Sequence, residues 1–315
     1  MRFGSLFAGV GGFDLGLEAA GWECGWQVEW DPHCQQTLAH HWPTVPRWGD
    51  VATVNGADLP PVDVITFGSP CQDLSVAGKR AGLEGSRSGL FFEATRIIEE
   101  MRDATGNTFP RWAIWENVAG AISSNRGADF GRVLKEMDNI GACFSEWRIL
   151  DAQHFGIPQR RRRIFLVSCF DTDTATRCPT QLLADTPSST RGDTQVRETR
   201  PRNTIRAANK TTGISGRNFY RHKFGGYIET DVLGTLRVSP GACFDGNLIL
   251  DVDGKVRRIT PEECERAMGW PTGHTATGVK GRIAHVHRFK MCGNGVASPV
   301  ARWIAEQINQ AEHGM

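Results

Sequence analysis

Residues 6–13 read LFAGVGGF, with glycines at positions 9, 11 and 12. This stretch ends an apolar run, residues 2–7, that is typical of a short strand, and it leads into a helix-like stretch near 13–20. Its three glycines let the backbone approach a ligand where a Cβ would collide. The spacing is G-x-G-G and departs from the G-x-G-x-x-G of dinucleotide loops, so it favours an adenosyl cofactor or a plain tight turn over NAD.

A second strand is expected at 25–29, and it ends at Glu29, 20 residues beyond Gly9. A carboxylate at this place can accept hydrogen bonds from both hydroxyls of a ribose. We therefore expect Glu29 and the glycine-rich loop to line one nucleotide-like site.

Alternating strands and helices continue over the first 170 residues. Further strands are expected at 62–67, 112–115 and 164–168, and helices at 31–41, 90–101 and 130–137. This alternation predicts an α/β fold with a parallel sheet covered by helices on both faces.

The pattern changes after residue 170. Residues 171–223 are rich in Thr, Ser, Arg, Asp and Gly, and short strand-like pieces follow at 227–229 and 247–252. Helical character returns at Thr260, where Thr-Pro-Glu-Glu is typical of a capped helix start, and a last helix is expected at 299–310. We therefore predict a catalytic and cofactor-binding domain at 1–170, a small, loop-rich domain at 171–280, and a C-terminal segment at 281–315 that returns to the first.

Composition and charge narrow the class of protein. The chain has 315 residues, 40% hydrophobic and 23% charged, as in ordinary globular proteins. It has no apolar stretch of membrane-spanning length and no signal-peptide pattern at its start, so a cytoplasmic location is expected. The net charge of +1 conceals a basic cluster at 197–223, with eight Lys/Arg and one acid, against a net −6 elsewhere. The cluster fits phosphate binding, and equally a solvated loop.

Cys71 has a chemical context that the other cysteines lack. Nine cysteines are present without a C-x-x-C pair, so no metal site is expected, and most should be small buried hydrophobes. Cys71 follows Gly-Ser-Pro just beyond the strand at 62–67, where open α/β sheets bind ligands, and polar Gln72 comes next. This setting opposes burial and favours a nucleophile over a structural thiol.

Two further segments carry charged side chains to the same edge of the sheet. Glu116 ends the strand at 112–115 and should face the crevice of Cys71, as a candidate for a raised pKa and proton transfer. In QRRRR at 159–163, strand alternation places Arg161 and Arg163 on one face. A surface glutamate and a generic basic patch are the alternatives.

The segment GKRAGLEGSRSG at 78–89 is rich in glycine and carries three basic residues. It is typical of a mobile loop that can fold over an anionic ligand, or of a plain surface loop.

Taken together, these segments resemble the DNA cytosine-5 methyltransferase family of bacteria and phages. The motifs stand in the family's order: FAGVGGF, Glu29-Trp30, Asp50-Val51, GSPCQDLS around Cys71, RSGLFFE at 87–93, Glu116-Asn117-Val118, FGIPQRRRR at 155–163, RRITPEECERAMGWP at 257–271 and GNGVASP at 293–299. The unmatched part, about 170–256, is where this family keeps its variable target-recognition region, and the basic cluster lies inside it.

The resemblance implies a Rossmann-like, S-adenosylmethionine-dependent methyltransferase domain with a small target-recognition domain. It implies that Cys71 attacks carbon 6 of a cytosine flipped out of a specific duplex DNA sequence, and that carbon 5 takes the methyl group. Glu116 would hydrogen-bond or protonate ring nitrogen 3. Arg163, with Arg161 behind it, would hold the base oxygen and the cysteine loop. Elimination of Cys71 would then restore the ring.

The resemblance also implies binding residues. For S-adenosylmethionine they are Phe7, Gly9, Gly11, Gly12, Phe13, Glu29, Trp30, Asp50, Val51, Pro70, Leu90, Asn294, Gly295 and Val296. Within this set, Phe7 would stack on adenine, Asp50 would bind the adenine amine, and residues 294–296 the methionine end. For DNA we expect Gln72, Ser75, Lys79, Arg80, Arg87, Arg206, Lys210, Arg217, Arg221 and Lys223. A monomer acting on nucleoid or phage DNA is expected, with a cognate restriction endonuclease as a separate partner.

The sequence departs from the family pattern at three places. Met268 stands where glutamine or leucine is frequent, Trp270 replaces a phenylalanine, and Gly295 occupies a position that is often serine. None of these touches the roles of the cysteine, the glutamate or the arginines.

Three alternatives remain at this point. An RNA cytosine methyltransferase would share the catalytic set, although the basic cluster favours duplex DNA. A non-catalytic DNA-binding relative is disfavoured by the intact set. An NAD-dependent oxidoreductase accounts for only the first 30 residues.

Overall fold

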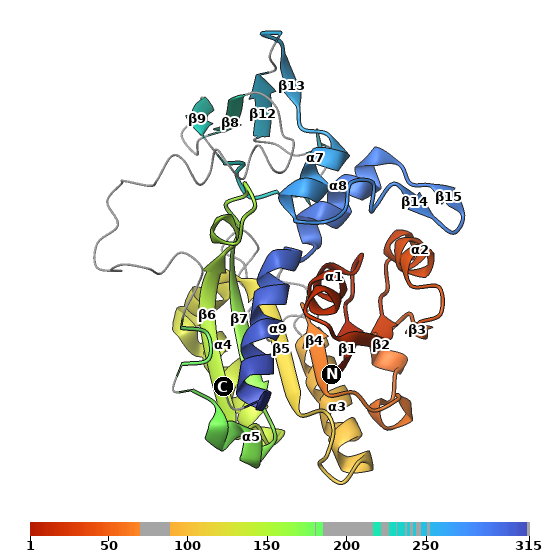
Figure 1. Ribbon diagram of the computed structural model, residues 1–315, viewed down its shortest axis with the longest axis vertical. Coiled ribbons are helices and arrows are strands. Elements are labelled where there is room, and N and C mark those ends of the chain that lie inside the picture. Colours follow the sequence, from red (N-terminus) through yellow and green to blue (C-terminus); the bar gives the residue numbers. More distant parts are fainter. Residues whose placement is uncertain are drawn as a thin grey trace.

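The chain folds around one large sheet with a small sheet beyond it (Figure 1). This computed structural model describes residues 1–69, 89–179, 181–184, 217–221, 227–230, 232–236, 238–239, 242–243, 247–250 and 253–313. The large sheet has seven strands in the order β3-β2-β1-β4-β5-β7-β6. These strands are β1 (Arg2–Leu6), β2 (Glu23–Val28), β3 (Arg47–Trp48), β4 (Val64–Phe67), β5 (Trp112–Val118), β6 (Phe144–Asp151) and β7 (Arg162–Cys169).

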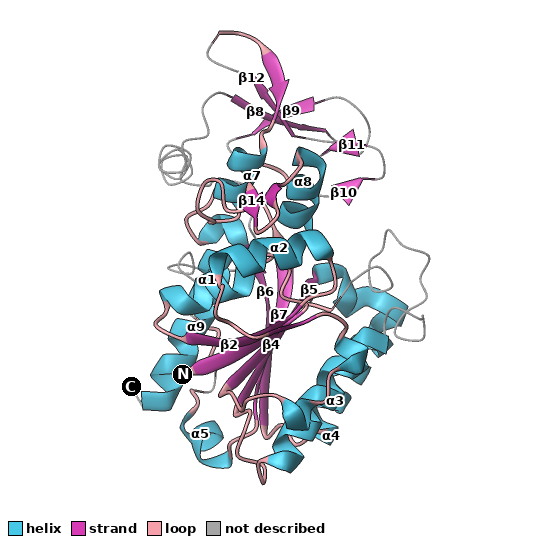
Figure 2. Cartoon of the chain, turned by 90° about the vertical axis from the view of Figure 1, so that its right-hand side faces the viewer, coloured by secondary structure: helices cyan, strands magenta, loops and turns pink. Residues whose placement is uncertain are grey.

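Helices cover both faces of this sheet, as Figure 2 shows. They are α1 (Gly12–Ala19), α2 (Pro32–His41), α3 (Gly89–Ala104), α4 (Ala128–Asn139), α5 (Thr172–Arg177) and α9 (Ser298–His313). Alternate residues of the central strands belong to two hydrophobic cores, one on each face of the sheet. Trp112 and Ile114 pack with α1 and α9, whereas Ala113 and Trp115 pack with α3 and α4. The period-2 alternation of buried strands explains the two-faced burial.

The predicted Rossmann-like α/β class is confirmed, but the expectation of a parallel sheet is wrong in one part. Strands β3, β2, β1, β4 and β5 run parallel, whereas β7 is antiparallel to both β5 and β6. A short connection, residues 152–161, joins β6 to β7 and leaves no length for the crossover that a parallel pair requires. Strand β6 itself was not predicted, although the alternating polar residues of FSEWRILD are typical of a half-exposed strand.

The second unit contains a four-stranded sheet of order β13-β12-β8-β9 and a two-stranded ribbon. Its strands are β8 (Arg217–Arg221), β9 (Tyr227–Thr230), β10 (Val238–Ser239), β11 (Ala242–Cys243), β12 (Asn247–Leu250) and β13 (Val256–Arg258). The division of the chain at 171 and 281 stays a prediction. Helix α5 packs against β7 and α9, so residues 172–177 lie with the large sheet.

The chain returns to the large unit through α7 (Pro261–Ala267), a hairpin of β14 (Thr277–Gly278) and β15 (Gly281–Arg282), and α8 (His285–Asn294). The predicted capped start of α7 is present: Thr260 accepts from the Glu263 N–H while the Glu263 carboxylate accepts from the Thr260 N–H. Figure 2 shows α2 between α1 and β14. Within the described residues, no helix is long and apolar enough to span a membrane.

Candidate active site

Glu116 lies where the sequence predicted, at the carboxyl end of β5 beside the end of β4. Its carboxylate is so close to the other strand that a Cβ on Gly68 would lie 3.4 Å from Glu116 Oε2. Residues of β5 also hold Ser69: Trp115 Nε1 donates to Ser69 Oγ at 3.2 Å and Asn117 Nδ2 donates to Ser69 O at 3.3 Å. The chain is therefore anchored to β5 immediately before Pro70 and Cys71.

The two predicted arginines meet this glutamate. Arg163 Nε lies 3.1 Å from Glu116 Oε1, and both side chains are largely buried. Burial raises the pKa of Glu116, while the positive charges of Arg163 and Arg161 oppose the rise. The neighbouring Arg160 and Arg162 are exposed. Arg161 and Arg163 therefore lie on one face, as predicted, and the Glu116 carboxyl group beside them has a pKa above its ordinary value.

Arg161 joins this cluster to the GNGV segment at the C-terminus. Its Nη2 donates to Gly293 O at 3.1 Å and to Gly295 O at 2.5 Å, and the residue is only 2% exposed. One guanidinium therefore touches the segment expected to bind the methionine end of the cofactor and contributes to the field at Glu116.

The glycine-rich loop lies against the same C-terminal segment. A Cβ on Gly12 would stand 2.5 Å from the carbonyl oxygen of Val296, so only glycine fits there. Ser298 Oγ donates to Gly12 O at 3.0 Å. The loop after β1 and the residues before α9 thus form one packed unit, although the whole chain separates them.

Glu29 bridges the loop and the start of α2. Its two carboxylate oxygens accept from the Gly9 N–H and the Asp31 N–H, each at 2.7 Å. Burial raises the pKa of Glu29 to about 7, and the two backbone N–H groups oppose that rise. Each oxygen keeps a further lone pair, so the carboxylate can still accept from ribose hydroxyls.

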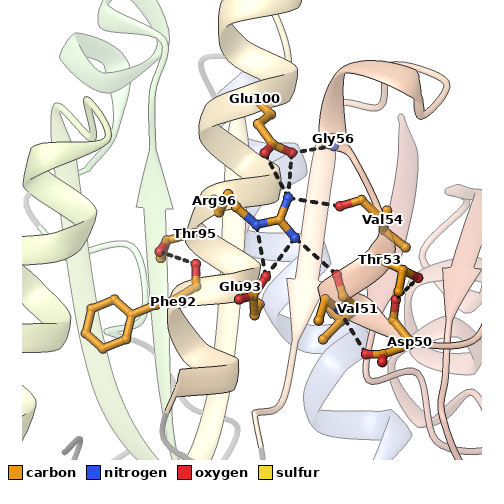
Figure 3. A network of polar contacts seen from close by, with 11 residues as sticks. Asp50, Val51, Thr53, Val54, Gly56, Phe92, Glu93, Thr95, Arg96 and Glu100 are labelled. Carbon is orange, nitrogen blue, oxygen red and sulfur yellow. Dashed lines mark hydrogen bonds and ion pairs between the residues drawn. The ribbon is translucent and has the colours of Figure 1, made fainter.

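Asp50 begins a turn that Arg96 of α3 holds in place (Figure 3). Arg96 donates to Val51 O at 3.2 Å and to Val54 O at 2.9 Å, and its guanidinium also pairs with Glu93 and Glu100. The Asp50 carboxylate accepts from the Ala52 N–H through Oδ1. The turn that carries the expected adenine-binding residue is therefore fixed to α3 by charged groups, a contact that the sequence did not predict.

The remaining expected cofactor residues surround these groups. Phe7 has a left-handed backbone, with φ of 54°, at the end of β1, and Trp30 is 72% exposed beside Glu29. A Cβ built on Gly9 meets nothing within 4 Å. Phe13 is buried in the core that α1 shares with α9, and Leu90 lies in the first turn of α3. The open space at Gly9, next to the Glu29 carboxylate, fits an adenosyl ligand.

Two of the departures from the family pattern form one packing unit. A Cβ on Gly295 would lie 2.5 Å from Cη2 of the Trp270 indole. Trp270 Nε1 donates to Val296 O at 3.0 Å. Since the wider ring at 270 fills the space that a serine at 295 would need, the two departures compensate each other.

Several expected residues lie outside the described residues. These are Pro70, Cys71, Gln72, Ser75, Lys79, Arg80, Arg87, Arg206, Lys210 and Lys223. Arg217 and Arg221 begin and end β8, where the backbone alone is described.

Six of the described cysteines are poor candidates for the role of nucleophile, and the exposed Cys143 is not among them. Burial raises the pKa of Cys24, Cys34, Cys169, Cys178, Cys264 and Cys292. A thiol with a raised pKa holds less thiolate at neutral pH. Within the described part of the chain, no group of three His, Cys, Asp or Glu side chains is placed to hold a metal ion.

Sequence reasoning missed the buried carboxylate of Asp14. It accepts from Ser5 Oγ at 3.0 Å and from Gln27 Nε2 at 2.7 Å, and it fixes α1 to β1 and β2. The charge in an otherwise apolar helix, FDLGL, was the available signal.

Comparisons with known proteins agree with this geometry. A sequence model described as "C-5 cytosine-specific DNA methylase" matches residues 1–310. Type II methyltransferase M.HhaI of Haemophilus parahaemolyticus is 29% identical over 99% of this chain and 95% of its own length. Type II methyltransferase M.Bsp6I of Bacillus sp. (strain RFL6) is 29% identical over 98% of both chains. The crystal structure of S. pombe Dnmt2 methyltransferase shares the fold, with a TM-score of 0.66, 16% identity and 98% of both chains covered.

The family match spans nearly the whole chain, and the fold brings three residues of its motifs, Glu116, Arg161 and Arg163, near one another. This chain belongs to the C-5 cytosine-specific DNA methylase family, whose members are S-adenosylmethionine-dependent methyltransferases.

Proposed function

We propose that this chain methylates carbon 5 of a cytosine flipped out of a specific duplex DNA sequence, through a covalent adduct with Cys71. The observation that carries the proposal is the Glu116–Arg163 ion pair at the carboxyl ends of β4 and β5, 3.1 Å between Nε and Oε1. It supplies a buried acid and a fixed cation beside the strand end that leads to Cys71.

Glu116, Arg163 and Cys71 have separate roles in the proposed reaction. Glu116, whose pKa burial raises, donates its proton toward ring nitrogen 3 and so makes carbon 6 electrophilic. Arg163 holds the carboxyl group and presents its remaining N–H groups to the base oxygen. The Cys71 thiolate adds to carbon 6 and leaves after carbon 5 has lost its proton. Bound S-adenosylmethionine supplies the methyl group.

The described residues fit that cofactor. Glu29 would accept from the ribose, Asp50 from the adenine amine, and Phe7 and Trp30 would flank the adenine. Asn294, Gly295 and Val296 would face the methionine end, since Arg161 already holds the carbonyl groups of Gly293 and Gly295.

The test is expression in a host that lacks cytosine-5 methylation, followed by mapping of methylcytosine at base resolution, with Cys71→Ser as the control. Methylation at one short recurring sequence, absent in the control, is the expected result. Equal methylation by Cys71→Ser would contradict the covalent mechanism. Methylation of transfer RNA but not of duplex DNA by the purified protein would contradict the DNA substrate.

DNA binding by the basic cluster has a separate test. Replacing Arg206, Arg217 and Arg221 by glutamine should weaken duplex binding and reduce the slope of log K against log salt by about 3, at about 0.9 per phosphate contact. An unchanged slope would place the cluster away from DNA. The chain is proposed to act as a monomer, with any cognate endonuclease acting separately. Elution as a dimer or larger oligomer in size-exclusion chromatography at working concentration would contradict the monomer.

A further inference from the structure

A buried histidine touches the backbone of the glycine-rich loop. His274 follows α7, is 3% exposed, and places Nε2 2.7 Å from the carbonyl oxygen of Val10. A carbonyl oxygen only accepts, so Nε2 carries the proton in this contact. Val10 lies between Gly9 and Gly11, which both have a left-handed backbone, at φ of 59° and 83°. The histidine thus holds the middle of the turn expected to contact the cofactor.

The backbone on both sides of His274 is rigidly held. The fully buried Glu265 carboxylate accepts from the Gly273 N–H at 2.6 Å and from the Thr275 N–H at 2.9 Å. Arg288 of α8 neutralises that carboxylate at 2.8 Å. Such charge-assisted bonds are the stronger ones in proteins, so the imidazole is presented in one position.

Helix α2 closes the other side of the imidazole. The His41 ring stacks on His274 at 4.2 Å between centroids, and His41 Nε2 lies 2.7 Å from His274 O. The indole of Trp42 covers Gly11, where a Cβ would meet it at 2.4 Å. Burial lowers the pKa of His274 to about 4, so the ring is neutral near pH 7.

We propose that His274 is a positioning residue for the adenosyl cofactor, acting through its hydrogen bond to Val10 O. The Val10 carbonyl shares its peptide plane with the Gly11 N–H, which donates to Ala8 O at 2.9 Å. Holding that carbonyl therefore fixes the turn from Ala8 to Gly11, and this turn carries the Gly9 N–H that donates to Glu29. Without the donor, the buried carbonyl loses its partner and the turn can rotate away from the shape that binds the ligand. The inference rests on the proposed function, because it presumes that the loop binds S-adenosylmethionine.

The test compares His274→Gln with His274→Met, two side chains of similar length of which only the first keeps an N–H donor. Binding of S-adenosylmethionine is measured by calorimetry. The KM for S-adenosylmethionine and kcat are measured separately, with duplex DNA as the methyl acceptor. We expect His274→Met to bind about tenfold more weakly, equivalent to about 1.4 kcal/mol, and His274→Gln to recover most of the loss. The kcat at saturating cofactor should not change. His40→Met, at an exposed histidine of the same region, is the control and should bind as the wild type does.

Equal affinities of the glutamine and methionine variants for S-adenosylmethionine would overturn the role of the donor. A loss in kcat with an unchanged KM for S-adenosylmethionine would overturn it as well. If His274→Met does not fold, His274→Phe, which keeps the stacked ring, becomes the donor-free member of the pair. Failure of the wild type to bind S-adenosylmethionine would refute the proposed function itself, which separates the two results.

Discussion

The affinity for S-adenosylmethionine should depend on the ionisation of Glu29. Burial raises the pKa of this carboxyl group from 4.5 to about 7. At 1.36 kcal/mol per pKa unit, that rise corresponds to about 3 kcal/mol against the charged form. Only the charged form offers both oxygens as acceptors to ribose hydroxyls while still accepting from Gly9 and Asp31.

The size of the effect follows from the fraction ionised. At pH 6 about one molecule in eleven carries the Glu29 charge, so the apparent Kd should be about tenfold weaker than its plateau above pH 8. Because the amino group of the cofactor also titrates, the wild type is compared with Glu29→Gln by calorimetry at each pH between 5.5 and 8.5. The variant should bind weakly and lack the part of the slope that Glu29 causes.

Stability of the ligand-free protein gives an independent measure. Between pH 4.5 and 7 the folded protein keeps the Glu29 proton and the unfolded chain has released it, so the free energy of unfolding falls as pH rises. The fall assigned to this group is about 3 kcal/mol, and urea unfolding of Glu29→Gln should lack it. Identical pH slopes in the two proteins, for binding and for stability, would refute the reasoning.

Three further predictions concern other parts of the site. Glu116→Gln should keep cofactor binding and lower kcat on duplex DNA at least about 100-fold, because the proton donor is lost; a kcat within tenfold of wild type would contradict this. Gly295→Ser should cost about 1–3 kcal/mol in urea unfolding, from the clash with the indole, and adding Trp270→Phe should restore much of it; strictly additive effects would show that the two positions are independent. Arg96→Met should raise KM for the cofactor with little change in kcat, because it frees the turn after Asp50, and an unchanged KM would count against this role.

Local sequence patterns predicted much of the fold. The start of α7 at a Thr-Pro-Glu-Glu cap and of α2 after Asp31 depends on side chains that bond the adjacent backbone, within three residues. The G-x-G-G turn and the buried strands before Cys71 and Glu116 are equally local. The carboxyl ends of parallel strands meet at one edge of a sheet, so the meeting of Glu116 with the end of β4 could also be expected.

The reversed direction of β7 could not be predicted from alternation alone, since strand periodicity is the same in both directions. The pairing of Arg96 with the turn after Asp50 joins residues more than 40 apart, and neither the helix pattern nor the turn contains a sign of the other. The Trp270–Gly295 pair was visible as two separate departures, but their contact was not.

The amino-acid sequence alone was thus enough to predict the α/β class and the family, and it is the source of the acid, the arginines and the nucleophile that we propose, because these inferences depend on spacing along the chain. The groups that hold the glycine-rich loop and the GNGV segment at 293–296 became apparent only in the folded structure. His274 reaches Val10 across 264 residues, and Arg161 reaches Gly293 across 132. Such contacts arise when helices and strands pack in three dimensions, and a hydrogen bond requires a geometry that no local pattern encodes.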